Sequence, residues 1–552
     1  MEITLLNLQQ IDKLIRSTKG KSKVNTGFKI DNLQIIYSGH DRVEAVRNVS
    51  FESKPGECVA LIGKTGSGKT TIAKALAGLL PGQARINPES KILFDGMDIR
   101  SIPKSRLFEF RKSVRYIFQQ PLECFNPILR LGKQFSDIIK LHEGSGRSPR
   151  ARSEEVLAKV YLKDYNRMLS AYPHELSLGQ LQRVNMAMAL VGQPKVILAD
   201  EPLASVDAIN RNEIIEIFKE MQKVSGIGLM IISHDLQLVQ ALADRWLVLK
   251  EGTLFDHGEG SILQSSSSNE YTRELIAAYQ NLLAPRAVKK VSVAPVLKIR
   301  NLTYNYQSEK GIWKWEKRNF EALRNINMTL YDKDTLGLIG ESGSGKSTLA
   351  MIMGGLLYPG ADKLFLNEEE VLAGQYASKS YYKKIQYILQ EAESSFAPKR
   401  RVGKQLTDVI SAFKIPTRSK NQMVLDFLND LGLDKSYFNR FSHELSGGEK
   451  QRIAFARAML VQPEILILDE SFSGLDRKTL HENLKVLLSL QTKYSFAIIL
   501  ISHDINLIGH FCNRVIVLKE GQLIEEGLKD TILSNPSDPY TKKLIEAAQI
   551  PR

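Results

Sequence analysis

Short apolar runs alternate along this chain with longer stretches in which apolar residues recur at helical spacing. Helical periodicity is clearest at 153–164 and 421–433. The most continuous apolar runs are 57–63, 196–200, 335–340 and 465–469. Such runs predict strands buried on both faces, and their alternation with amphipathic stretches predicts an α/β fold with helices covering a parallel sheet. The two periodic stretches predict a helical subdomain inserted between strands.

Four motifs occur twice, in the same order. GKTGSGKTT is repeated as GESGSGKST, HELSLGQLQRV as HELSGGEKQRI, VILADEP as ILILDES, and IISHD as LISHD. The copies lie 277 residues apart for the first motif (69 to 346) and 269 apart for the others (177 to 446, 200 to 469, 234 to 503). Two homologous domains therefore follow one another, with loops of different length between their first and second motifs.

The two copies meet in APRAVKKVSVAP, a stretch of small and basic residues bounded by prolines, which predicts an exposed linker. Ahead of the first copy, LLNLQQIDKLIRS has Leu and Ile at helical spacing opposite basic residues. That extension is either a solvated tail or a helix that lies on a membrane or packs on the domain. The predicted organisation is an extension at 1–26, a first domain at 27–284, a linker at 285–295 and a second domain at 296–552.

Composition and charge narrow the possible partners. Lys and Arg number 75 and Asp and Glu 61, a net charge of +14 that favours an anionic partner: nucleic acid, a phospholipid surface or a phosphorylated ligand. Cys58, Cys124 and Cys512 are too far apart in sequence for a disulfide framework, zinc ribbon or iron–sulfur cluster. No apolar run approaches the ~18–20 residues of a spanning helix, and no signal peptide is recognisable. We expect an intracellular protein whose membrane role, if any, is peripheral.

Both Gly-rich motifs fit G-x-x-x-x-G-K-(S/T) and follow an apolar strand, where glycines let successive backbone N–H groups wrap a phosphate chain. Lys69 and Lys346 are expected to reach the β- and γ-phosphates, and Thr70 and Ser347 to place a hydroxyl on Mg²⁺. Aromatic candidates for stacking on adenine are Tyr37 and Tyr306. The P-loop residues predicted to bind nucleotide are Gly63, Lys64, Thr65, Gly66, Ser67, Gly68, Lys69, Thr70, Thr71, Gly340, Glu341, Ser342, Gly343, Ser344, Gly345, Lys346, Ser347 and Thr348.

Each domain also contains an apolar strand that ends in Asp-Glu, the Walker B motif. Asp200 and Asp469 stand at the carboxyl ends of these strands and are expected to hold Mg²⁺ through water. Glu201 and Glu470 point the opposite way, because side chains alternate along a strand, and are predicted to polarise the attacking water. An acidic strand end can serve solubility alone, but the P-loop upstream favours the catalytic interpretation.

Histidine and glutamine recur at matched places. His234 and His503 each follow a strand, 34 residues after the Walker B aspartate, and are predicted to hydrogen-bond the γ-phosphate and position the water. Gln119 and Gln390 each end an apolar strand and are predicted to contact Mg²⁺ or the water. A single histidine is more often structural, and a strand-end glutamine is often a loop residue, so the matched spacing is what favours these roles.

The sequences LSLGQ at 176–180 and LSGGE at 445–449 lie between the P-loop and the Walker B strand of each domain. They resemble the signature motif of ABC transporter ATPases, and the resemblance extends over about 28–280 and 296–552. It implies tandem P-loop NTPase domains that bind ATP and Mg²⁺ and hydrolyse ATP. Each domain is then a RecA-like core with an antiparallel β subdomain and a helical subdomain.

In that family the two domains close head to tail, so that one domain's signature covers the nucleotide on the other's P-loop. The resemblance implies an intramolecular ATPase dimer with two composite sites. Site one combines Lys69, Glu201 and His234 with the second signature, represented by Ser446, Gly447, Gly448 and Glu449. Site two combines Lys346, Glu470 and His503 with the first signature, represented by Ser177, Gly179 and Gln180. The two glutamines resemble Q-loops, and SVD at 205–207 and GLD at 474–476 resemble D-loops.

Finer resemblance indicates the oligopeptide/dipeptide/nickel importer subfamily. It rests on IFQQPLECFNP, YPHELS, YTRELIAA and DPYTKKLIEAA, which begin at residues 117, 172, 271 and 538. It implies a peripheral subunit on the cytoplasmic face of the membrane that powers import of peptides, nickel or related small ligands. Its partners are then two transmembrane permease subunits and, indirectly, an extracellular substrate-binding protein, with no nucleic acid expected.

Two departures from the family pattern stand out. The first signature has Leu178 where the family has glycine, and a side chain there crowds the amides that face the γ-phosphate. We therefore expect site two to be the weaker site. The cysteine cluster that some subfamily members carry is absent. Alternatives that stay open are another ABC importer or exporter, or a tandem ATPase acting on ribosomes or DNA, which the short linker and the D-loop sequences disfavour. The ATPase domains do not identify the cargo.

Overall fold

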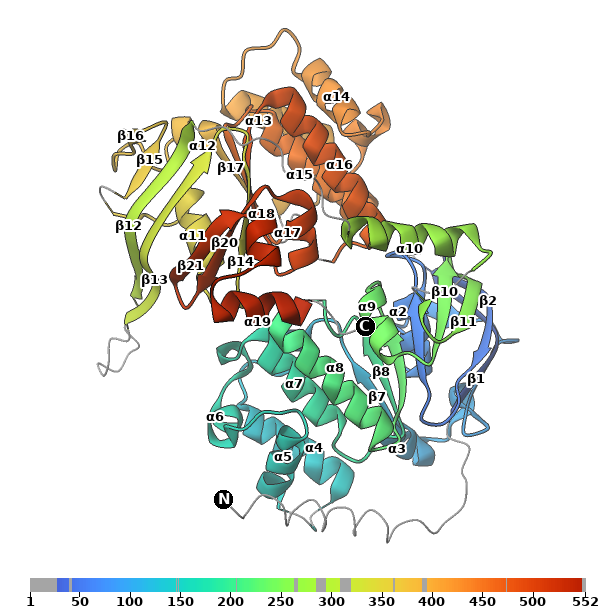
Figure 1. Cartoon of the computed structure of the whole chain (residues 1–552). Helices are drawn as coiled ribbons and strands as arrows, with labels where there is room; N and C mark the ends of the chain where they lie inside the picture. Colours follow the sequence, from blue (N-terminus) through green and yellow to red (C-terminus); the bar gives the residue numbers. More distant parts are fainter. Residues whose placement is uncertain are drawn as a thin grey trace.

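The computed structural model describes residues 27–38, 42–144, 146, 148–204, 206–262, 267–283, 294–307, 319–360, 363–389, 395–472 and 474–548. Within this part of the chain no helix has the length and apolar character needed to cross a bilayer. Two halves of the same α/β architecture follow one another (Figure 1).

The first half is built on two sheets. The central one has the strand order β11-β10-β3-β9-β8-β7 and is parallel except for β11. Its strands are β3 (Cys58–Ile62), β7 (Val114–Ile117), β8 (Val196–Asp200), β9 (Gly228–Ile232), β10 (Arg245–Lys250) and β11 (Thr253–Glu259). The other is antiparallel and contains β1 (Phe28–Ser38), β2 (Arg42–Glu52), β4 (Ala84–Ile86), β5 (Lys91–Phe94) and β6 (Met97–Asp98). Strands β3, β8 and β9 are buried at every position, which explains their unbroken apolar runs.

Helices surround this core and connect its strands. The α-helices of the first half are α2 (Lys69–Leu76), α3 (Lys104–Ser113), α4 (Leu131–Glu143), α5 (Pro149–Ala158), α6 (Tyr165–Ser170), α7 (Leu178–Ala189), α8 (Ala208–Lys223), α9 (Leu236–Leu242) and α10 (Glu270–Leu283). Single 3₁₀ turns occur at η1 (Ile99–Ser101), η2 (Pro121–Cys124) and η3 (Pro173–Glu175). Helix α4 packs against α5 and α6, and α5 packs against α7, forming the helical subdomain that the sequence predicts.

The second half repeats this plan. Its central sheet has the order β17-β18-β19-β14-β20-β21, again parallel except for the last strand. The strands are β14 (Thr335–Ile339), β17 (Ile385–Ile388), β18 (Ile465–Asp469), β19 (Ala497–Ile501), β20 (Arg514–Lys519) and β21 (Gln522–Leu528). Its antiparallel sheet contains β12 (Pro295–Gln307), β13 (Asn319–Tyr331), β15 (Leu364–Leu366) and β16 (Glu369–Glu370). Its helices are α11 (Lys346–Met353), α12 (Lys379–Lys384), α13 (Val402–Ala412), α14 (Lys420–Asp430), η6 (Lys435–Asn439), η7 (Ser442–Glu444), α15 (Gly447–Met459), α16 (Arg477–Tyr494), α17 (Ile505–Phe511), α18 (Lys529–Ser534) and α19 (Pro539–Ala548).

The structure confirms the predicted α/β class, with parallel sheets, antiparallel sheets and helical subdomains in both halves. The two periodic stretches are helical only in part. Helix α5 ends at Ala158 and the chain turns at Tyr161, with φ 59°, while α14 ends at Asp430 and turns at Gly432, with φ 68°. A left-handed residue ends a helix, although the apolar spacing continues past it.

The boundaries between domains remain a prediction. Strand β12 begins at Pro295, the last residue of the predicted linker. The extension at 1–26 and the stretch at 284–293 lie outside the described residues.

The last helix of each half packs on the other half. Helix α10 leaves the first half and lies against α16 and α17, and α19 leaves the second half and lies against α8 (Figure 1). The two halves therefore face each other through reciprocal contacts, which places their motifs at a shared interface.

Candidate functional site

Each Gly-rich motif forms a tight loop between a buried strand and a helix. Gly63 follows β3 with φ 153°, and a Cβ there would lie 2.3 Å from the Leu249 carbonyl oxygen and 2.7 Å from Ser67 Oγ. Gly340 follows β14 with φ 150°, and a Cβ there would lie 2.2 Å from the Leu518 carbonyl oxygen. Only glycine lets the backbone approach so closely, so the loop shape accounts for the residue type.

The P-loop lysines are folded into their own loops. Lys69 Nζ donates to the Gly63 and Lys64 carbonyl oxygens, both at 2.8 Å, and Lys346 makes the same two bonds in the second half at 2.9 and 2.7 Å. Burial lowers the pKa of Lys69, and nearby carboxylates oppose that effect; one of them, Asp476, belongs to the other half. Both ammonium groups therefore sit inside a ring of backbone oxygens and nearby acidic groups.

The predicted metal ligands lie together at the end of each Walker B strand. Thr70 Oγ1 donates to Asp200 Oδ1 at 3.1 Å, and Ser347 Oγ to Asp469 Oδ1 at 3.4 Å. Burial raises the pKa of Asp200, while its hydrogen bonds oppose that rise. A hydroxyl and a carboxylate at this spacing are oxygen ligands of the kind that Mg²⁺ prefers.

Sequence reasoning missed two tyrosines that belong to this cluster. Tyr116 OH donates to Asp200 Oδ2 at 2.8 Å, and Tyr387 OH to Asp469 Oδ2 at 2.5 Å. Both lie in the strand before the Q-loop, in YIFQ and YILQ, so their repetition at matched positions was a usable signal. Gln119 itself lies exposed just beyond β7, and Gln390 is outside the described residues.

The glutamates predicted to be catalytic and the strand-end histidines come together in both halves, at different distances. Glu201 Oε1 lies 2.8 Å from His234 Nδ1, whereas Glu470 Oε1 lies 3.9 Å from His503 Nδ1. Burial raises the pKa of Glu470, but His503 and Lys346 outweigh it, so the net pKa is lowered and the carboxylate stays ionised near neutral pH. An ionised base beside an imidazole is suited to orienting and deprotonating water.

Both glutamates also have a left-handed backbone. Glu201 and Glu470 each have φ 45°, and their N–H groups donate to the carbonyl oxygens of Ile232 and Ile501 at the ends of the neighbouring strands. For a residue with a Cβ this conformation costs about 1–3 kcal/mol and persists only where the surrounding structure holds it. Both halves therefore hold the glutamate at the strand end in the same conformation.

The signature residues begin long helices. Ser177 caps α7 and Ser446 caps α15, each in a reciprocal capping box, with Gln180 and Glu449 respectively. Their last glycine has a structural reason: a Cβ at Gly179 would lie 3.0 Å from the Asn210 side chain on α8, and one at Gly448 would lie 2.2 Å from Thr479 Cγ2 on α16. The preceding position differs, because a Cβ at Gly447 would meet only Leu475 Cδ2, at 3.6 Å.

The tyrosines proposed to stack on adenine lie beside the P-loop helices. Tyr37 OH is 3.5 Å from Thr71 Oγ1, and Tyr306 OH is 3.3 Å from Thr348 Oγ1. Their rings are thus next to the end of each Gly-rich motif. Stacking on the base remains a prediction.

The D-loop aspartates act across the interface. Asp476 of the second half raises the pKa of Lys69, and Asp207 of the first half raises that of Lys346, in both cases against the larger effect of burial. Asp207 also acts on Glu341, the second residue of the second P-loop. Each P-loop is therefore approached by a helix N-terminus of the opposite half, the arrangement expected of a head-to-tail dimer.

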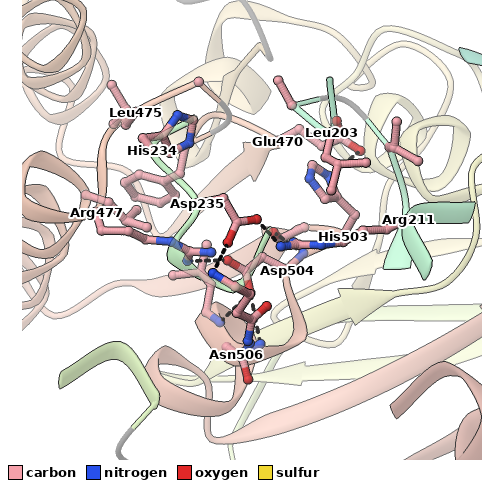
Figure 2. Close-up of a pocket in the computed structure, with 18 of the residues that line it drawn as sticks. Leu203, Arg211, His234, Asp235, Glu470, Leu475, Arg477, His503, Asp504 and Asn506 are labelled. Atoms are coloured by element: carbon pink, nitrogen blue, oxygen red, sulfur yellow. Dashed lines mark hydrogen bonds and ion pairs between the residues drawn. The ribbon is translucent and has the colours of Figure 1, made fainter. Parts of the chain in front are cut away.

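Residues of both halves line one cavity of about 90 Å³ (Figure 2). Both glutamates and both strand-end histidines are among the lining residues. Arg211 pairs with Asp235 of the same half, and Arg477 pairs with Asp504 at 2.5 Å. Burial raises the pKa of Asp504, but Arg477 outweighs it and the pKa falls to about 2. Two ion pairs therefore line the cavity together with the glutamates and histidines predicted to be catalytic.

A family model described as "ABC transporter" matches residues 46–204 and 323–473, together more than half of the chain. The chain belongs to the ABC transporter family. This ABC ATPase is 34% identical to the peptidoglycan transport ATP-binding protein YejF of Agrobacterium fabrum, over 91% of its own length and 93% of the relative's. It is 30% identical to the glutathione import ATP-binding protein GsiA of Escherichia coli, strain K12, over 94% of its own length and 89% of the relative's.

These similarities run through both halves, so the tandem ABC architecture expected from the repeated motifs is confirmed. The chain is an ATP-binding, ATP-hydrolysing subunit of an ABC transporter. The peptide-importer resemblance is supported as well, whereas neither relative's name mentions nickel.

Proposed function

We propose that this chain is the cytoplasmic energy-coupling subunit of a peptide-type ABC importer, hydrolysing ATP at two composite sites. The observation that carries the proposal is the crossed arrangement of P-loops and D-loops in a chain similar over its full length to transport ATPases. The two relatives are named for peptidoglycan and glutathione, molecules that both contain peptide bonds. Peptides or peptide conjugates are therefore the cargo class we favour.

Each P-loop is suited to hold ATP with Mg²⁺. Backbone N–H groups of the loop and the N-terminus of the following helix favour an anion, and Lys69 supplies a positive charge at that point. The Thr70 hydroxyl and the Asp200 carboxylate already lie 3.1 Å apart and fit the oxygen ligands of Mg²⁺. Bound Mg²⁺ would neutralise charge that develops on the phosphates.

Hydrolysis then depends on groups that this chain supplies. Glu201 and Glu470 would accept a proton from the attacking water, and the adjacent histidines would orient it and bond the γ-phosphate. The signature Ser and Gly residues at the starts of α7 and α15 would cover the nucleotide from the opposite half. The interface between the halves therefore assembles each site, and it excludes water when closed.

Partners and location follow from this role. We propose that the chain docks on two transmembrane permease subunits at the cytoplasmic face of the membrane and responds to an extracellular substrate-binding protein through them. No nucleic-acid partner is needed, since the basic charge of the chain suits an anionic membrane surface.

The decisive experiment is cargo-dependent ATPase activity. The chain is reconstituted with its permeases and binding protein in vesicles and tested with di- and oligopeptides, glutathione and Ni²⁺. Stimulation by a peptide class is expected, and the Glu201→Gln, Glu470→Gln double variant serves as a control that assembles but does not turn over. ATPase activity that ignores every cargo, or failure to bind the permeases, would contradict the proposal.

A further inference from the structure

Each half ends in a helix that begins beside its own P-loop and packs on the other half. Helix α19 lies against α8, where Asn212 Nδ2 donates to the Ala547 carbonyl oxygen at 3.0 Å. Helix α10 lies against α16 and α17, where Glu274 pairs with Lys478. The two helices are thus exchanged between the halves, and each one connects a P-loop to the opposite ATPase domain.

The start of α19 holds the second P-loop directly. Tyr540 OH accepts a hydrogen bond from the backbone N–H of Glu341 at 3.0 Å. The tyrosine is buried, and Lys519 Nζ lies 5.0 Å from its ring centre. In the first half Tyr271 is placed in the same way: it is buried, and Lys250 Nζ lies 5.0 Å from its ring centre. The backbone of Lys64, at the matching P-loop position, opposes the rise in the tyrosine's pKa caused by burial.

The start of each helix is also fixed to the last strand of its own half. Ser537 Oγ donates to Glu525 Oε1 on β21 at 2.7 Å, and Thr272 Oγ1 donates to Asp256 Oδ2 on β11 at 2.6 Å. Each helix is therefore held to the sheet of its own half, and in the second half the tyrosine hydroxyl joins that helix to the P-loop.

The helix that receives α19 leads back to the same P-loop. Helix α8 begins at its N-cap Asp207, whose charge acts on Lys346 and Glu341. Five residues further on, Asn212 binds the end of α19. Two connections therefore link the second P-loop to α8: the charge of Asp207 at the start of α8, and the contacts that run from Tyr540 along α19 to Asn212.

We propose that Tyr540 is a positioning residue that sets the ATP affinity of site two by holding the second P-loop in register with α8 of the opposite half, and that Tyr271 does the same for site one. The inference rests on the proposed role of the P-loops in binding ATP. A loop already held in one conformation loses less entropy when it binds a ligand. The charges that act on the Tyr540 hydroxyl are those of Glu341, Asp207 and Glu520, whereas His503 and Lys346 act on Glu470. ATP affinity should therefore change while turnover does not.

The test uses the full chain with Tyr540→Phe, which removes the hydroxyl and keeps the ring. In a Glu201→Gln background only site two turns over, so the KM for ATP and kcat report on that site. We expect KM to rise about three- to tenfold, the effect of losing one hydrogen bond, with kcat within about twofold and the melting temperature unchanged. Tyr271→Phe in a Glu470→Gln background should behave in the same way for site one.

A double-mutant cycle then tests the connection through α19. Tyr540 lies near the start of α19 and Asn212 contacts the helix near its end, about 10 Å away along its axis. If the two residues acted independently, their effects on KM would multiply. We expect Asn212→Ala to raise the KM for ATP by a smaller factor when Tyr540→Phe is present than when it is absent. Tyr494→Phe is the matched control, because its hydroxyl donates to Asp430 at 2.7 Å, remote from either P-loop, and should leave KM unchanged.

Three results would overturn the inference: an unchanged KM in Tyr540→Phe, multiplying effects in the cycle, or a loss of kcat that matches a fall in melting temperature. The last would assign the tyrosine a folding role. Direct titration with a fluorescent ATP analogue distinguishes failure of this inference from failure of the proposed function. If the unmodified chain does not bind the analogue, the proposed function itself is wrong.

Discussion

Leu178 opens helix α7 directly after the Ser177 cap, at the position that Gly447 holds at the start of α15. A Cβ at Gly447 would have Leu475 Cδ2, at 3.6 Å, as its nearest neighbour, which is ordinary van der Waals contact. A side chain at this position is therefore compatible with the fold of its own half. The cost of leucine falls on whatever faces the start of α7 across the interface, which in the proposed arrangement is the nucleotide of site two.

The size of that cost follows from the contacts at stake. Leu178→Gly should restore close approach of the α7 amides to the γ-phosphate, and one hydrogen bond contributes about 0.5–1.5 kcal/mol. That corresponds to a gain of about two- to twelvefold in kcat/KM at site two. The change also removes a side chain from the first turn of a helix, so the chain should lose at most about 1 kcal/mol of stability.

The assay isolates one site at a time. Leu178→Gly is measured in a Glu201→Gln background, where only site two hydrolyses ATP. The reciprocal change Gly447→Leu is measured in a Glu470→Gln background and should lower kcat/KM at site one by a similar factor. If Leu178→Gly leaves site two unchanged while Gly447→Leu still folds and retains full activity at site one, crowding at this position is not what separates the two sites.

Three further predictions concern individual groups. Thr70→Ala should abolish Mg²⁺-dependent hydrolysis at site one while ATP binding in EDTA persists, as measured by analogue titration. Asp504→Asn should lower the melting temperature at pH 7, because the folded pKa of Asp504, about 2, lies below its unfolded value. The pair with Arg477 then contributes about 2–3 kcal/mol of stability above pH 4, which is lost as pH falls toward 2. The difference in melting temperature between the variant and the unmodified chain should therefore narrow at pH 3. Glu341→Gln should tighten ATP binding at site two by up to about fivefold, since it removes a carboxylate that faces Asp207.

Much of the fold was predictable because its strands are buried on both faces. The runs at 57–63 and 465–469 have no alternation to obscure them, and the repeat locates their counterparts. Helix ends were less predictable: the apolar spacing of 153–164 continues past Ala158, where a left-handed turn at Tyr161 ends the helix. A backbone conformation adopted by a tyrosine leaves no clear trace in composition.

The candidate site was predictable where chemistry repeats at a matched position, as with the P-loop lysines and Walker B carboxylates. The ion pairs beside the site were not. Arg211 and Arg477 pair with the equivalent aspartates Asp235 and Asp504 but occupy different positions on α8 and α16, so comparing the two repeats cannot find them. Tertiary packing alone brings them together.

The two sites differ in ways that support one another. Site one has Lys64 at the second P-loop position and a glutamate 2.8 Å from its histidine. Site two has Glu341 at that position, facing the like charge of Asp207, with the corresponding distance 3.9 Å. A leucine in the signature that would cover site two adds to this difference. The leucine and the Glu341–Asp207 repulsion both disfavour closure of site two. Helix α19 opposes them, because Tyr540 binds the second P-loop at its start and Ala547 binds α8 of the opposite half near its end.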